Sequence, residues 1–111
     1  MPFDKFIDFE TISEERDKAI KKSIRTIGLD ELKKLGEEIF PYPDDPWRTT
    51  LFRLIKERPH ATYYQATAGD HVVFLYCLEE DLGLWFLRGS GVGPLSERGK
   101  QMVKDAIKQK R

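Results

Sequence analysis

Apolar and polar positions form their clearest pattern between residues 62 and 88. Three short runs rich in β-branched and aromatic residues follow one another there, at 62–67, 71–78 and 84–88. The turn residues Ala68-Gly69-Asp70 separate the first two runs, and a polar loop at 79–83 separates the last two. Short strand-like runs joined by short turns predict an antiparallel β-meander of three strands.

The middle run is apolar at every position from Val72 to Leu78. Because successive side chains of a strand point to opposite faces of a sheet, this run presents an apolar surface on both sides. Such a strand is normally central and covered on both faces. We expect helices to cover one face and the N-terminal arm, or a second subunit, to cover the other.

Two helical patterns begin the chain. The first starts with Thr11 or Ser13 as its N-cap, and Gly28 ends it. The second spans residues 31–39 with Asp30 as its cap. The residues before the first helix alternate imperfectly, and we expect them to form either an edge strand or an extended arm.

A third helix is predicted after a proline-rich loop, because Asp45 suits an N-cap and Pro46 suits the first helical position. Pro59 ends it. The last helix begins near Pro94 or Ser96 and continues to the C-terminal residues, with an apolar stripe and many basic side chains. The predicted class is therefore α+β. A three-stranded meander, or a four-stranded sheet if the N-terminal arm adds a strand, packs against three N-terminal helices and one C-terminal helix.

Length and composition indicate a soluble protein with a single domain over residues 1–111. There is no 18-residue apolar window and no signal-peptide pattern, so we expect a cytoplasmic protein without a membrane partner. The lone Cys77 lies in the most apolar run, where a structural role is expected and an intrachain disulfide is impossible.

The charge is balanced overall but not along the chain. The formal net charge is zero, yet residues 1–17 carry six acids and two bases, whereas residues 94–111 carry six bases and two acids. A net charge of zero does not favour nucleic acid as a partner. The basic C-terminal helix is the surface through which nucleic acid could still bind, and otherwise we interpret both ends as solvated faces.

The glycine-rich segment Gly89-Ser90-Gly91-Val92-Gly93 follows the last strand and precedes a helix. Its spacing matches neither a dinucleotide-binding fingerprint nor a P-loop. Its glycines are expected to serve a tight corner that needs positive φ. The alternative is a generic anion site, made by flexible N–H groups and nearby hydroxyl and basic groups at a helix start. Its residues would be Arg88, Ser90, Gly91, Gly93, Ser96 and Lys100.

A second candidate is the cluster of Tyr42, Trp47 and Arg48 around the proline-rich loop. Tyr, Trp and Arg are the residue types that dominate binding hot spots, so the cluster is a candidate partner-binding surface. The rival interpretation makes Trp47 a core anchor with Tyr42 as a lid over it. His60 and His71 flank the first strand without any metal-ligand spacing, so we expect no metal and no cofactor. No catalytic residue is predicted.

The order of a helical pair, the segment TYYQATAGDHVVFLYCLEEDLGLWFLR and a terminal helix resembles bacterial RelE/ParE-type toxins over roughly residues 12–110. The resemblance implies helices before an antiparallel meander, and a ribosome-dependent endoribonuclease or gyrase inhibitor. It implies Arg88, Tyr63 and Tyr64 as RNA-facing residues. The chain departs from that family in its neutral charge and its additional helix before the sheet.

The function expected from the sequence is a non-catalytic binding or protein-interaction module, whose partner is another protein or a second copy of the chain. The alternatives are a toxin-type ribonuclease of the RelE/ParE kind, or a small enzyme that binds an anionic ligand at the glycine corner.

Overall fold

The computed structural model describes residues 14–69, 72–87 and 91–110. The helices are α2 (Glu14–Ser23), α3 (Leu29–Ile39), α4 (Pro46–Glu57) and α5 (Glu97–Gln109). The strands are β1 (Arg25–Thr26), β2 (Tyr63–Thr67), β3 (Val72–Cys77), β4 (Leu82–Leu87) and β5 (Gly91–Pro94).

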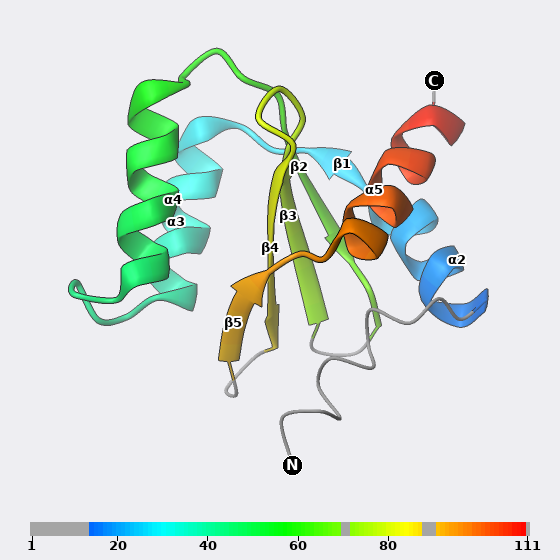
Figure 1. Cartoon of the computed structure of the whole chain (residues 1–111), viewed down its shortest axis with the longest axis horizontal. Coiled ribbons are helices and arrows are strands. Elements are labelled where there is room, and N and C mark those ends of the chain that lie inside the picture. The colour runs from blue at the N-terminus through cyan, green and yellow to red at the C-terminus, as the bar shows by residue number, and fades with distance from the viewer. Residues whose placement is uncertain (1–13, 70–71, 88–90, 111) are drawn as a thin grey trace.

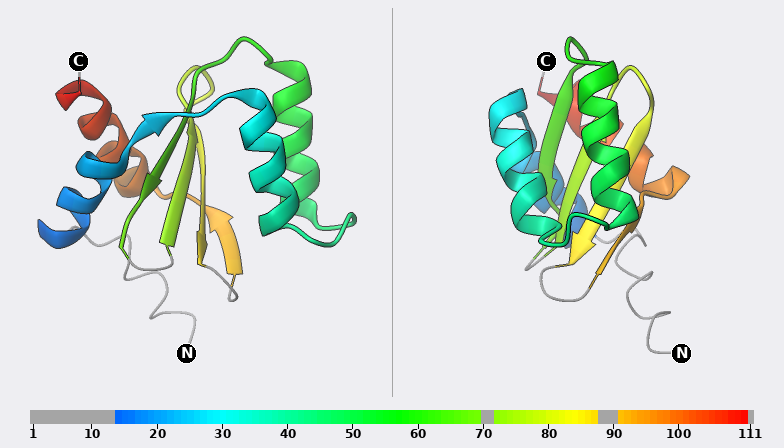
Figure 2. Two further views of the ribbon diagram at one scale, coloured as in Figure 1. Left: turned by 180° about the vertical axis from the view of Figure 1, so that it is seen from behind. Right: turned by 90° about the vertical axis from the view of Figure 1, so that its left-hand side faces the viewer.

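These elements form three layers, with the sheet between two pairs of helices (Figure 1). Helices α2 and α5 pack side by side on one face, and α3 and α4 cover the other, as the turned views in Figure 2 also show. The five strands are antiparallel and follow chain order, β1-β2-β3-β4-β5. The predicted α+β class is confirmed, but the sheet has two strands more than the predicted meander.

Strand β3 is central and all six of its residues are buried. Phe74 faces a cluster formed with α2 and α5, whereas Leu75 faces a cluster formed with α3 and α4. The prediction that both faces are covered is thus confirmed. The prediction that the N-terminal arm or a second subunit covers one face is wrong, because each face has its own helix pair. The N-terminal arm itself lies outside the described residues.

The first helix ends at Ser23 and not at the predicted Gly28. The Ser23 hydroxyl donates to the carbonyl of Ala19 at 2.7 Å and accepts the N–H of Thr67 at 2.8 Å, which fixes the helix end beside β2. The chain continues extended as β1, and Ile24 and Ile27 enter the two opposite clusters. Ile24 and Ile27 are three positions apart, and an odd separation in an extended chain places two side chains on opposite faces of a sheet. The predicted caps Thr11 and Ser13 lie outside the described residues.

Helix α3 begins at Leu29 with Gly28 as its N-cap, two residues before the start predicted from Asp30. No side chain caps it, and Asp30 lies in the first turn, where the helix dipole favours an acid. Helix α4 begins as predicted: Asp45 accepts the N–H of Trp47 at 2.8 Å and Pro46 occupies the first turn.

The segment predicted as a glycine corner is partly a strand. Gly91–Pro94 forms β5, which pairs with β4. Of the two predicted helix starts, Pro94 therefore lies in the strand, and Ser96 is the N-cap of α5. The prediction that these glycines are needed for positive φ is wrong for Gly91 and Gly93, because neither has a positive φ. A Cβ on Gly93 would lie 2.9 Å from the Trp85 indole, so close packing of the ring requires glycine there. Gly89 lies outside the described residues.

Candidate functional site

An open groove of about 580 Å³ lies between α3, the proline-rich loop and β5. Its lining comes from four separate parts of the chain. Of the ten described residues that line it, seven are apolar or aromatic, two are acidic and one is glycine. They are Leu35, Glu38, Ile39, Pro41, Tyr42, Asp45, Phe86, Leu87, Gly91 and Val92.

Tyr42 is the most exposed large apolar side chain among the described residues, with 71% of its surface accessible. Its backbone carbonyl accepts the N–H of Asp45 at 3.1 Å, which closes a turn. Pro41 and Pro43 flank it and restrict the backbone further. Tyr42 is therefore a large aromatic residue on a restrained loop, so binding through it costs little backbone ordering.

The groove has an acidic rim. Glu38 comes from the last turns of α3 and Asp45 from the cap of α4, and none of the described residues that line the groove is basic. Asp45 already uses one carboxylate oxygen to accept the Trp47 N–H, whereas Glu38 is exposed. An apolar surface beside two carboxylates favours a ligand that is apolar and carries a positive charge.

The three residues of the predicted partner-binding cluster have different surroundings. Tyr42 lines the groove, whereas Trp47 packs partly buried against the α3–α4 core cluster. The Arg48 guanidinium donates to the carbonyl of Phe40 at 2.7 Å and lies 5.4 Å from the centre of the Phe52 ring. The partner-binding role of the three stays a prediction, and the geometry places only Tyr42 in the groove.

The predicted anion-site residues are also separated by structure. Gly91 and Gly93 lie in β5, and the Ser96 hydroxyl accepts the N–H of Gly99 at 3.1 Å. The Lys100 ammonium pairs with Glu97 at 2.8 Å and donates to a backbone carbonyl in the β3–β4 turn. Arg88 and Ser90 lie outside the described residues. The anion site stays a prediction.

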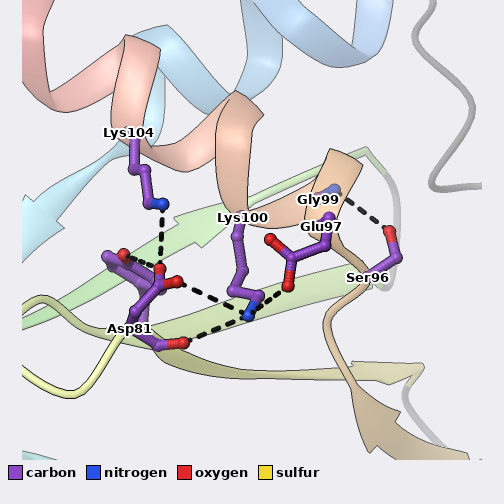
Figure 3. Close-up of polar contacts among 7 residues, drawn as sticks. Asp81, Ser96, Glu97, Gly99, Lys100 and Lys104 are labelled. Carbon is purple, nitrogen blue, oxygen red and sulfur yellow. Dashed lines mark hydrogen bonds and ion pairs between the residues drawn. The ribbon is translucent and has the colours of Figure 1, made fainter.

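A polar cluster joins the β3–β4 turn to α5 (Figure 3). Asp81, at a left-handed φ of 49°, accepts the Tyr76 hydroxyl at 2.5 Å and pairs with the ammonium of Lys104 at 3.0 Å. Lys100 Nζ lies 3.6 Å from the same carboxylate and donates to the Asp81 carbonyl at 3.2 Å.

The ionisation of this cluster fits a structural clamp. The Tyr76 hydrogen bond, followed by that of Lys104, holds the pKa of Asp81 below its usual value. Glu97 and Asp81 raise the pKa of Lys100. Burial, aided by Asp81, raises the pKa of Tyr76. Each shift stabilises the form that makes the contact, so the cluster is suited to holding the turn and not to transferring protons near neutral pH.

The clamp predicts a pH-dependent stability. Asp81→Asn keeps the side-chain shape and tolerates a left-handed backbone, but it removes the charge. Because the folded pKa of Asp81 is lowered, its contribution is complete above the ordinary value of 3.8 and is lost as pH falls through the lower folded value. We expect the variant to have a lower urea midpoint than the parent at pH 7, and the difference to shrink below about pH 4.

Asp44→Asn is the control for this experiment, because Asp44 is an exposed aspartate of the proline-rich loop. It should lower the midpoint less than Asp81→Asn does at pH 7. A difference between Asp81→Asn and the parent that stays constant from pH 7 to pH 2.5 would contradict the clamp.

Two other side chains with reactive groups, Cys77 and Tyr63, are buried. Burial raises the pKa of the Cys77 thiol. Burial also raises the pKa of Tyr63 to about 12, and its hydroxyl donates to the carbonyl of Arg58 at 2.9 Å. Over the described part of the chain, no group of three or more His, Cys, Asp or Glu side chains is placed to hold a metal ion. Within the same residues, no helix is both long and apolar enough to cross a membrane.

Comparisons of the chain with protein-family models, with curated proteins and with solved structures gave no match. Of the residues that the RelE/ParE resemblance implies, Tyr63 is buried against the α3–α4 cluster, and Tyr64 packs against the cluster on the other face. These two tyrosines therefore do not form one surface. Arg88 lies outside the described residues.

Sequence reasoning missed most of the groove. Its apolar residues come from α3, the proline-rich loop, β4 and β5, so no local pattern marks them as a set. One signal was present: Leu35 and Ile39 extend the apolar stripe of α3 as far as the proline-rich loop. Both remain only partly buried in the fold.

Proposed function

We propose that the protein is a non-catalytic protein-interaction module, and that it binds a segment of a partner protein in the groove beside β5. The observation that carries this proposal is the groove itself. It combines a wide apolar lining, an exposed tyrosine on a restrained loop and an acidic rim. Concave, mainly apolar sites with a few polar groups are where ligands bind.

Two other features of the described residues favour binding over catalysis. The titratable cluster at Asp81 is engaged in contacts that hold the fold together. Among the described residues, the groove offers two carboxylates and the Tyr42 hydroxyl as polar side chains. The pocket lined in part by Cys77 is apolar, with a volume of only about 20 Å³. A groove of this kind provides affinity through apolar contact and orientation through charge.

The proposal can be tested by selecting random displayed peptides on the immobilised full chain. We expect enriched peptides that combine apolar residues with lysine or arginine. Tyr42→Ala should raise their Kd at least about fivefold, because truncation of a tyrosine anchor commonly costs more than about 1 kcal/mol of binding free energy. Leu82→Ala is the matched control, since Leu82 is also exposed but lies at the other end of β4 and outside the groove.

Two results would contradict this function. One is a selection in which every enriched peptide binds Tyr42→Ala as well as it binds the parent. The other is growth arrest with cleavage of messenger RNA when the chain is expressed in bacteria, which would support the ribonuclease alternative. We expect expression to leave growth and messenger RNA unchanged.

A further inference from the structure

The free edge of β5 has a defined pattern of hydrogen-bonding groups. The Leu95 N–H donates to the Gly83 carbonyl at 2.9 Å, and the register of β4 and β5 continues from that pair. In an antiparallel pair, hydrogen-bonded and non-hydrogen-bonded positions alternate. Val92 and Pro94 therefore occupy positions whose backbone groups point away from β4.

The choice of residues on this edge agrees with the pattern. Pro94 has no N–H to offer, and an outward position on an edge strand is where proline is tolerated. The edge thus presents the N–H and carbonyl of Val92 and the carbonyl of Pro94. Within the described chain, β5 is the last strand of the sheet and no other strand pairs with this side.

The groove reaches this edge strand, because Gly91 and Val92 of β5 form part of its lining. The Val92 side chain is half-buried and packs towards the α3–α4 cluster. A strand added beside β5 would place the side chain opposite Val92 on that same face of the sheet. That face is where Leu35, Ile39 and Tyr42 line the groove.

We propose that the partner segment binds in extended form as a sixth strand along β5, with an apolar side chain in the groove opposite Val92 and a lysine or arginine beside Glu38 or Asp45. This inference rests on the proposed function and specifies the chemistry of the partner. Main-chain hydrogen bonds to the edge provide part of the affinity, and the groove provides the selection for side chains. The two rim carboxylates select the positive charge.

Backbone methylation tests the strand addition. A peptide selected on the full chain is resynthesised with one N-methyl group at a time, because a methylated amide cannot donate a hydrogen bond. In a bound strand, every second amide faces β5. We expect at least tenfold weaker binding at alternate central positions and less than about threefold change at the positions between them.

A charge exchange tests the partner's basic residue. Glu38→Lys should weaken binding of the lysine-containing peptide at least fivefold, and a peptide with that lysine replaced by glutamate should recover it. Glu37→Lys is the matched control: it changes the net charge equally, but Glu37 is outside the groove lining. Equal effects of the two variants would overturn the basic-residue assignment.

The outcomes separate this inference from the proposed function. Methyl groups tolerated at every position, with binding that still depends on Tyr42, would overturn the strand addition and leave the interaction module intact. Weaker binding at methylated positions that do not alternate along the peptide would also overturn the strand addition. Peptides that bind independently of Tyr42 would overturn both.

Discussion

Phe74→Ala should lower the free energy of unfolding by about 3–5 kcal/mol, the range for a large aromatic side chain lost from a core. Phe74 is 1% exposed and lies in the middle of the central strand. It faces α2 and α5, and it is opposite Ala66 on β2 and Trp85 on β4. A cavity there has walls from three strands and two helices, so it cannot close by the movement of one element.

The measurement is urea unfolding followed by tryptophan fluorescence. Trp47 packs on one face of the sheet and Trp85 on the other, so single-tryptophan variants report on the two clusters separately. Because both clusters share β3, we expect the two transitions to coincide and to shift together. Tyr42→Ala, at a site 71% exposed, is the control and should stay within about 0.5 kcal/mol of the parent. Two separate transitions, or a loss below about 1 kcal/mol for Phe74→Ala, would contradict the shared core.

Gly93→Ala should destabilise the fold by about 1–3 kcal/mol through overpacking. An added Cβ would lie 2.9 Å from Cζ2 of Trp85 and 3.0 Å from Cε2 and Nε1. Such contacts force either the indole or β5 to move. The backbone at Gly93 does not have positive φ, so the expected loss is steric and does not come from backbone strain.

Gly91→Ala is the matched control, because its added Cβ would be 4.0 Å from the same ring, an ordinary contact distance. Both variants are to be compared by urea unfolding in the parent and in a Trp85→Leu background. The cost of Gly93→Ala should fall once the indole is gone, which gives a measurable coupling between the two sites. Equal costs for Gly91→Ala and Gly93→Ala would contradict the steric explanation.

Local signals in the sequence predicted the parts of the fold that depend on local chemistry. The uninterrupted apolar run of β3 indicated a central strand with two covered faces. Asp45 and Pro46 marked the start of α4. Pro94 and Ser96 were the two candidates for the start of α5, and Ser96 is its N-cap. Each of these follows from a few adjacent residues, through burial, capping or a fixed φ.

The two edge strands could not be predicted in this way. β1 has only two residues, and it is a strand because it pairs with Gln65 and Tyr64, about 40 positions along the chain. β5 contains two glycines and a proline, residues that disfavour strands. It forms because Gly93 accommodates an indole from the neighbouring strand and Pro94 has an outward position. These are tertiary causes that no short window contains.

The candidate site likewise combines a residue that local sequence marks with residues that only the tertiary fold brings together. Tyr42 could be singled out from its residue type and its place in a proline-rich loop. The partners that make it part of a groove, such as Ile39 and Val92, are ordinary core-like residues in the sequence. They stay partly uncovered because the fold leaves an open groove between α3, the proline-rich loop and β5.

The most direct test of the groove as the binding surface is a ¹H–¹⁵N NMR titration of the full chain with a selected peptide. We expect the largest shifts at Tyr42, Gly91 and Val92, with small changes at Arg25 and Lys110, which are outside the groove lining. Shifts that concentrate at Arg25 and Lys110, with Tyr42, Gly91 and Val92 unmoved at saturation, would contradict this expectation.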